Sequence, residues 1–291
     1  MLSKESSLSV RRSLLYMPGA NERALEKAKG LDCDTLIFDL EDAVAPQAKA
    51  QARAQVVTAV RAGGYGYREL VVRCNGLDSP WGQDDLRALA DTPISALLFP
   101  KIETAQQVHK IAAELAMVSQ DLAIWIMIET PRAILDLEQL ASLASVQALV
   151  MGTSDLVTEL RASHVPGREN LQYALQRSLL VARLYGKEIF DGVQLNFTDA
   201  AAFRSECEQG RAMGFDGKTL IHPSQIGPAN AAFGETEAQV ERARGLLAAW
   251  DQALTSGKGV AVYEGQLVEN LHAAEARRII ARSEALAARP R

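Results

Sequence analysis

The sequence has few of the features that mark membrane, secreted or zinc-binding proteins. It contains no run of about eighteen uncharged apolar residues, which argues against a membrane span. Residues 1–12 mix serine with Lys4, Glu5 and two arginines, and they lack the apolar core of a secretory signal. The three cysteines are scattered and odd in number, so they indicate neither a disulfide framework nor a zinc site. We therefore expect a reducing, cytoplasmic setting.

The chain also has no excess of positive charge. Its 31 basic and 36 acidic residues give a net charge of −5, so no overall basic field attracts nucleic acid. We expect neither a nucleic-acid nor a membrane partner. If the substrate is an anion, local cations must bind it.

What the sequence does contain is a repeated alternation of short apolar runs with longer, alanine-rich amphipathic segments. Runs rich in Val, Ile, Leu and Phe of this kind are typical of buried parallel strands. We expect strands at residues 13–16, 35–40, 70–74, 96–100, 123–128, 148–151, 192–197 and 217–221.

Between the runs lie seven helical candidates, and strand–helix alternation favours a parallel α/β fold. These helices are expected at residues 22–29, 48–61, 84–90, 105–116, 133–144, 170–185 and 200–213. Eight runs in 291 residues favour a closed (β/α)8 TIM barrel over an open doubly wound sheet.

The pattern changes after the eighth run. Residues 236–253 predict a long helix, a glycine-bearing segment follows at 256–265, and a last helix begins at Leu271. Gly257 and Gly259 suit a mobile hinge. We therefore predict a barrel domain at 1–234 and a C-terminal helical extension at 235–291, which serves as a lid or an oligomer contact.

Polar residues lie at the ends of the apolar runs or directly after them, where a barrel places its active site. In chain order they are Glu41 and Asp42, Arg73, Lys101, Glu129, Asp155 and His222. Glu129 and Asp155 end neighbouring strands, so their carboxylates can converge on one cation. Two carboxylates with room for water suit Mg²⁺, and Arg73 opposite them completes a clamp for an acidic substrate.

Each of the acidic residues also has a purely structural interpretation. Glu41 and Asp42 can begin a solvated loop. Asp155 can be the N-cap of a helix at 156–160, and Glu129 can interact with the dipole of a helix that starts at Thr130.

The basic residues have structural alternatives as well. Arg73 can form a structural buried ion pair. His222 can be a packed, hydrogen-bonded side chain, and Lys101 can be a rim charge with a buried stem.

Seven segments, in order along the chain, resemble the citrate lyase β-subunit (CitE-like) branch of the HpcH/HpaI aldolase family, which includes malyl-CoA and citramalyl-CoA lyases. They are RSLLYMPG (12–19), DLEDAV (39–44), VRCNG (72–76), FPK (99–101), IETP (128–131), GTSDL (152–156) and GKTLIHP (217–223). The resemblance implies a (β/α)8 barrel that assembles as a homotrimer or hexamer. It also implies cleavage of a 3-hydroxyacyl thioester with Mg²⁺, or alternatively Mn²⁺.

The resemblance also implies roles for individual residues. Glu129 and Asp155 are expected to bind the metal, and Arg73 to contact the reacting oxygens. Glu41 and Asp42 are expected to orient metal-bound water. The remaining expected contacts are the Gly152 and Thr153 backbone to the substrate carboxylate, and Tyr16, Arg23, Lys27, Ile221 and His222 to coenzyme A.

One position departs from the family pattern. The lyase relatives carry an Asp near the C-terminus that reaches the neighbouring subunit's site, and here that position holds Glu269. Glu269 can serve as the base, although its extra methylene displaces the carboxylate, and displacement on this scale can lower the rate roughly a hundredfold. The alternative is that Glu269 is an exposed residue before the last helix.

These expectations predict a carbon–carbon lyase that acts on a small acyl-CoA. Citramalyl-CoA is favoured, giving acetyl-CoA and pyruvate, with malyl-CoA next. The alternatives are a thioesterase that hydrolyses the same substrates, and a citrate lyase β subunit that acts on a carrier-protein thioester.

Overall fold

The computed structural model describes residues 9–118 and 122–290. These residues form two compact units: Arg11–Phe233 is one, and residues 9–10 with 234–290 make up the other. None of the described helices is long and apolar enough to cross a membrane.

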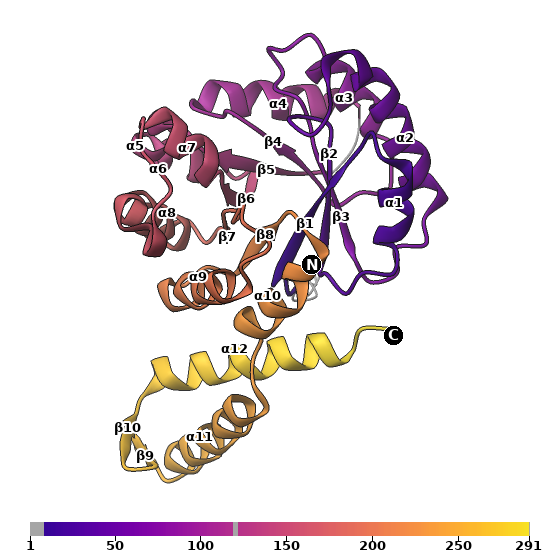
Figure 1. Ribbon diagram of the computed structural model, residues 1–291. Coiled ribbons are helices and arrows are strands. Elements are labelled where there is room, and N and C mark those ends of the chain that lie inside the picture. The colour runs from indigo at the N-terminus through magenta and orange to yellow at the C-terminus, as the bar shows by residue number, and fades with distance from the viewer. Residues whose placement is uncertain (1–8, 119–121, 291) are drawn as a thin grey trace. The chain divides into compact units, whose positions relative to one another are not determined.

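The larger unit is a closed barrel of eight parallel strands surrounded by helices (Figure 1). Each strand pairs with the next in the sequence, and β8 pairs with β1 to close the ring. The strands are β1 (Ser13–Pro18), β2 (Thr35–Asp39), β3 (Glu69–Arg73), β4 (Ala96–Phe99), β5 (Ala123–Ile128), β6 (Val146–Met151), β7 (Glu188–Asp191) and β8 (Gly217–Leu220). The predicted (β/α)8 barrel is confirmed.

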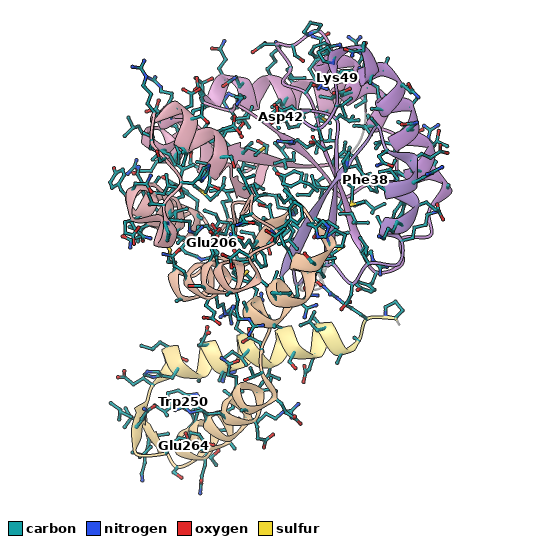
Figure 2. All side chains as sticks on the ribbon, viewed as in Figure 1. Phe38, Asp42, Lys49, Glu206, Trp250 and Glu264 are labelled. Carbon is teal, nitrogen blue, oxygen red and sulfur yellow. The ribbon has the colours of Figure 1, made fainter. Side chains whose placement is uncertain are left out.

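Alternation along each strand divides the core into two layers. One cluster fills the barrel interior, where Trp125 and Phe190 have ring centroids 5.3 Å apart. A larger cluster, which includes Phe38, lies between the strands and the helices (Figure 2). Because both faces of each strand are buried, the strands appear in the sequence as continuous apolar runs.

The helices around the barrel begin soon after the strands. They are α1 (Glu22–Ala28), α2 (Lys49–Ala62), α3 (Gly82–Leu89), α4 (Ala105–Met117), α5 (Pro131–Leu135), α6 (Leu137–Ala141), α7 (Thr153–Glu159), α8 (Gln172–Leu184), α9 (Ala200–Met213) and α10 (Ile226–Phe233). Side-chain oxygens of Asn21, Thr104, Thr130 and Asp199 cap the first free backbone N–H groups of α1, α4, α5 and α9.

Two of the predicted elements are wrong. The seventh strand is Glu188–Asp191, and residues 192–197 form a loop in which Leu195 and Phe197 are exposed. The apolar residues of this loop imitate a strand, whereas the true strand has only four residues. The helix predicted at 133–144 is two short helices, α5 and α6, which meet at Asp136.

An ion cluster closes the N-terminal end of the barrel. Arg11 pairs with Glu69 and with Glu188, the first residues of β3 and β7, and its guanidinium stacks on Trp125 at 5.2 Å. Polar groups at this end of a barrel serve stability, so the chemistry is expected at the other end.

A second buried charge network joins β7, β8 and α9. Lys218 is fully buried, and its Nζ lies 2.9 Å from Asp191 Oδ2 and 2.7 Å from Glu206 Oε1. Arg168 Nη1 bonds the other oxygen of Asp191 at 2.7 Å. These cations outweigh burial and lower the pKa of Asp191 below its ordinary value. The network fixes the end of β7, from which the loop enters the active-site end of the barrel.

Lys218→Met tests this network. Removing one partner leaves buried carboxylates with less compensation, which should lower the free energy of unfolding by about 3–5 kcal/mol. Urea denaturation at neutral pH measures the loss. The matched control is Lys110→Met, which removes an exposed ion pair with Asp78 and should cost about 1 kcal/mol or less. Equal effects of the two substitutions would contradict the role of the network.

The smaller unit is built from two helices and a hairpin. Helix α11 (Glu237–Thr255) starts at the cap Thr236, β9 (Ala261–Tyr263) pairs antiparallel with β10 (Gln266–Val268), and α12 (Asn270–Ala287) follows. Its core is Trp250, Ala253, Ala261, Val268 and Ala273, and Trp250 is labelled in Figure 2. The two predicted helices are present, whereas the hairpin was not predicted. The role of residues 235–291 as a lid stays a prediction.

Candidate active site

A cavity of about 400 Å³ opens at the C-terminal ends of the barrel strands. It is lined by Tyr16, Pro18, Asp39, Asp42, Ala43, Arg73, Met127, Met151, Gly152, Thr153, Ser154, Asp155, Val193, Leu195, Thr219 and Ile221. Seven of the eight strands, or the segments that follow them, supply these side chains, as expected for a barrel enzyme. Seven of the residues predicted for the site line the cavity: Tyr16, Asp42, Arg73, Gly152, Thr153, Asp155 and Ile221.

Arg73 is the fixed cation of the cavity. Its Nε and Nη2 donate to the two oxygens of Asp39 at 2.7 and 2.6 Å, and its Cζ lies 4.9 Å from the centre of the Tyr16 ring. Burial alone would lower the pKa of Arg73, but the bonds to Asp39 outweigh burial and raise the pKa well above its usual value. Nη1 remains directed toward Glu41 and Asp42, at 2.8 and 3.4 Å.

Asp39 lines the cavity and was not among the predicted site residues. It is the last residue of β2, it is 2% exposed, and the parallel register places it beside Arg73. Its oxygens also accept from the backbone N–H of Glu41 and Ala43, which fixes the turn after β2. A carboxylate that ends an otherwise apolar run was the available signal.

Glu129 follows β5 and is 1% exposed. Its Oε1 accepts from the backbone N–H of Lys101 at 2.7 Å. Burial raises the pKa of Glu129 to about 7, an effect that Asp155 increases and that Lys101 and Arg73 oppose. Gly152 gives Glu129 the space it needs, because a Cβ at position 152 would lie 2.4 Å from the Glu129 Cβ.

Lys101 contacts both carboxylates that we expected to bind metal. Besides the backbone bond to Glu129, its Nζ lies 2.6 Å from Asp155 Oδ1. The interpretation of Lys101 as a simple rim charge is therefore incomplete. Asp155 lies in the first turn of α7, whose N-cap is Gly152, so the alternative of Asp155 as an N-cap is wrong.

Glu41, like Glu129, has a carboxyl group whose pKa is raised. Burial raises the pKa of Glu41 to about 8, the charges of Asp42 and Glu129 add to the shift, and Arg73 opposes it. Its Oε2 is buried and forms an ion pair with Arg73, but the two groups are not oriented to form a hydrogen bond. Glu41 and Asp42 both line a neighbouring cavity that also includes Lys101.

The donor set around Glu129 fits a hard divalent cation. The buried carboxylate of Glu129 is linked to that of Asp155 through Lys101, which contacts both, and Asp155 lines the cavity. The described residues contain no group of three or more His, Cys, Asp or Glu side chains placed to hold a metal. A carboxylate pair that leaves other positions to water and substrate suits Mg²⁺ rather than zinc.

Glu41 and Glu129 are not among the residues that line this cavity, and neither are the four remaining predicted residues. Arg23 and Lys27 are exposed on α1, one turn apart. His222 follows β8 and stacks on Phe197 with ring centroids 4.6 Å apart. Glu269, in the smaller unit, is the N-cap residue of α12, where its backbone N–H donates to His272 Nδ1 at 3.0 Å.

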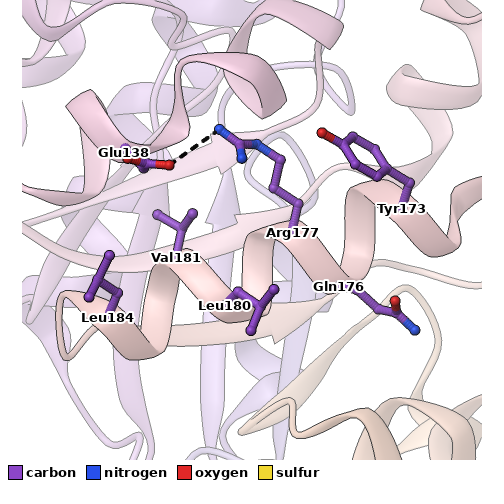
Figure 3. Close-up of a pocket in the computed structure, with 7 residues that line it drawn as sticks. All are labelled: Glu138, Tyr173, Gln176, Arg177, Leu180, Val181 and Leu184. Carbon is purple, nitrogen blue, oxygen red and sulfur yellow. Dashed lines mark ion pairs between the residues drawn. The ribbon is translucent and has the colours of Figure 1, made fainter.

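A depression on α8 is a poorer candidate for chemistry (Figure 3). Leu180, Val181 and Leu184 make much of it apolar, and its ion pair joins Arg177 Nη2 to Glu138 Oε1 at 3.7 Å. The acid that lines it, Glu138, has a side chain that is 57% exposed. The cavity at the strand ends is therefore the candidate active site.

Fold and cavity together define a (β/α)8 barrel with acidic residues and an arginine at its C-terminal end. A sequence profile of the HpcH/HpaI aldolase/citrate lyase family matches residues 12–223. The chain belongs to this family, whose members are enzymes, and the resemblance drawn from the seven segments is confirmed.

Relatives within the family carry different names. The chain is 47% identical to a (3S)-malyl-CoA thioesterase from Cereibacter sphaeroides, covering 95% of this chain and 96% of that one. It is 32% identical to the citrate lyase subunit beta of Escherichia coli, covering 94% and 93%. Among solved structures, CitE from Mycobacterium tuberculosis in complex with magnesium, acetoacetate and coenzyme A has a TM-score of 0.77 at 27% identity, covering 94% and 97%.

The pKa of Glu129 predicts a pH-dependent stability. With a folded-state pKa of about 7, Glu129 stabilises the metal-free fold fully below its unfolded value of 4.5, and this contribution is lost as pH rises through 7. Glu129→Gln removes the effect. Relative to the unsubstituted protein, it should gain stability between pH 5 and pH 8, by roughly 3 kcal/mol at most.

Urea denaturation in a chelator at both pH values measures the difference. Saturating Mg²⁺ is the control, because a bound cation favours the ionised carboxylate and should reduce the pH dependence. A stability difference that stays constant with pH would contradict the assigned environment.

Proposed function

We propose that the protein hydrolyses the CoA thioester of a small hydroxydicarboxylic acid, of the (3S)-malyl-CoA type, with Mg²⁺. The observation that carries this choice is the 47% identity, over nearly the whole of both chains, to a protein named (3S)-malyl-CoA thioesterase. Identity to the citrate lyase subunit beta is lower, at 32% over a similar length. The thioesterase, which the sequence alone placed second, therefore becomes the first candidate.

In this proposal Glu129 and Asp155 hold the metal. When bound, Mg²⁺ supplies Lewis acidity and a site for substrate oxygens. Arg73 lies on β3, across the cavity, and its position is fixed by Asp39. Its guanidinium stabilises the negative charge that develops on the thioester oxygen as water adds to the carbonyl carbon.

Glu41 is the proposed proton acceptor. A general base works best when its pKa lies near the operating pH, and the pKa of Glu41 is raised to about 8. Glu41 takes a proton from the attacking water, the C–S bond then breaks, and coenzyme A leaves as the thiolate. Asp42 is proposed to orient the water from the cavity wall.

Coenzyme A is proposed to lie near the C-terminal ends of β1 and β8. Tyr16 and Ile221 line the cavity there, and His222 presents an aromatic surface together with Phe197. Arg23 and Lys27 supply exposed cations for phosphate groups in a chain with a net charge of −5. The Gly152 and Thr153 backbone is proposed to bind the substrate carboxylate.

Carbon–carbon cleavage is the second candidate. It is favoured by the similarity to CitE solved with magnesium, acetoacetate and coenzyme A. A base must then remove the substrate's hydroxyl proton, and Glu269 of a neighbouring subunit is proposed for this step. The C–C bond breaks, Arg73 stabilises the acetyl-CoA enolate, and citramalyl-CoA would yield pyruvate. A homotrimer or hexamer, activity with Mn²⁺ and a cytoplasmic location are further proposals.

Product analysis separates the two reactions. With Mg²⁺ and (3S)-malyl-CoA, we expect one free CoA thiol for each malate formed and no 2-oxo acid. A thiol reagent and a hydrazine reagent for 2-oxo acids follow the two products, and citramalyl-CoA is assayed in parallel. Acetyl-CoA together with glyoxylate or pyruvate would reverse the order of the candidates.

The same assay tests the two proposed metal ligands against a control substitution. Glu129→Gln and Asp155→Asn should each lower kcat/KM by about a hundredfold or more, as expected for loss of electrostatic stabilisation. Glu138→Gln, at the depression on α8, is the matched substitution outside the site and should leave kcat/KM unchanged.

Glu269→Gln distinguishes the candidates through a different residue. If hydrolysis uses Glu41, this substitution should leave thiol release within about threefold of the original rate, because Glu269 caps α12 in its own unit. Any 2-oxo acid release should fall roughly a hundredfold, since that step needs a positioned base. A matching loss of both products would show that one base serves both reactions.

A further inference from the structure

Lys101 reaches two proposed metal-binding carboxylates through two different groups. Its backbone N–H donates to Glu129 Oε1 at 2.7 Å, and its side-chain Nζ donates to Asp155 Oδ1 at 2.6 Å. A single residue therefore places one positive charge where the proposed function requires a divalent cation.

The backbone half of Lys101 is held in place. Its φ of 54° lies in the left-handed region, which non-glycine residues adopt rarely and only where the surroundings impose it. On one side its N–H is bound by Glu129, which is 1% exposed. On the other side its carbonyl accepts from Gln107 Nε2 at 3.3 Å, a residue that also belongs to the capping box of α4.

The side chain of Lys101, by contrast, can move away from Asp155. The side chains of Lys101 and Asp155 are 51% and 34% exposed, so solvent screens their ion pair. Exposed pairs of this kind contribute little to stability, and a lysine side chain is flexible. By contrast, Arg73 is held to buried Asp39 through two bonds and its side chain is 9% exposed. Of these two cations, Lys101 is the one that can be displaced.

We propose that the Lys101 ammonium is a built-in counter-cation, which pairs with Asp155 in the metal-free enzyme and leaves when a divalent cation binds. The proposal rests on the proposed function, because Glu129 and Asp155 must be the metal ligands. Lys101 is then a positioning residue with two roles. Its backbone keeps Glu129 oriented in both states, while its ammonium competes with the metal and lowers its apparent affinity.

Mg²⁺ titration of the full-length Lys101→Met variant tests this competition by calorimetry, without substrate. Methionine keeps the backbone bond and the side-chain length but removes the charge. Because the exposed pair is weak, we expect Mg²⁺ to bind about three- to tenfold more tightly than to the unsubstituted protein. Lys101→Arg restores a cation and should return the affinity to within about twofold of the original.

The matched control is Lys110→Met, which removes a lysine of similar exposure on α4 that pairs with Asp78. It should leave Mg²⁺ affinity unchanged, which separates local competition from net charge. If Lys101→Met binds Mg²⁺ no more tightly than the unsubstituted protein does, the proposed role of Lys101 is overturned, but the proposed metal site is not. If the unsubstituted protein binds Mg²⁺ no better than Glu129→Gln, both the proposed metal site and this inference fail.

Discussion

The concentration of negative charge at one end of the barrel is the constraint on which the site depends. Five carboxylates gather there, from Asp39, Glu41, Asp42, Glu129 and Asp155, and Arg73 and Lys101 are the cations that pair with them. A buried charge is costly unless it is paired. Burial is the main reason that the pKa values of Glu41 and Glu129 are raised, and the neighbouring carboxylates add to both shifts. The same excess charge gives the cavity its expected affinity for a divalent cation.

The two cations divide their tasks because they differ in burial. Arg73 is held by two bonds to a carboxylate that is 2% exposed, so it is a permanent part of the cavity wall. Lys101 is anchored by its backbone, and its side chain is 51% exposed. A fixed cation suits a charge that develops during reaction, since preorganised groups need no rearrangement. A displaceable cation suits the proposed metal site, which could then take up a divalent cation without losing its shape.

The sequence predicted the barrel and seven of the residues that line the cavity, because both depend on local patterns. Burial on both faces produces apolar runs, and parallel strands bring the residues that follow them to one end. The strand prediction at residues 192–197 was wrong because a loop can be as apolar as a strand. The true strand, β7, is only four residues long. The partners of Arg73 and Lys101 depend on strand register and on a left-handed φ, and neither has a signature in single-sequence periodicity.

The distribution of residues between the two units bears on how one scaffold supports two reactions. The residues proposed for hydrolysis, Glu41, Arg73, Glu129 and Asp155, all belong to the unit Arg11–Phe233. Carbon–carbon cleavage needs in addition a base beside the substrate's hydroxyl group, and the family resemblance assigns that base to Glu269, in the other unit. In this chain Glu replaces the Asp of the family pattern, and Glu269 is the N-cap residue of its own helix. A change at Glu269 would therefore suppress carbon–carbon cleavage and leave all the residues proposed for hydrolysis in place.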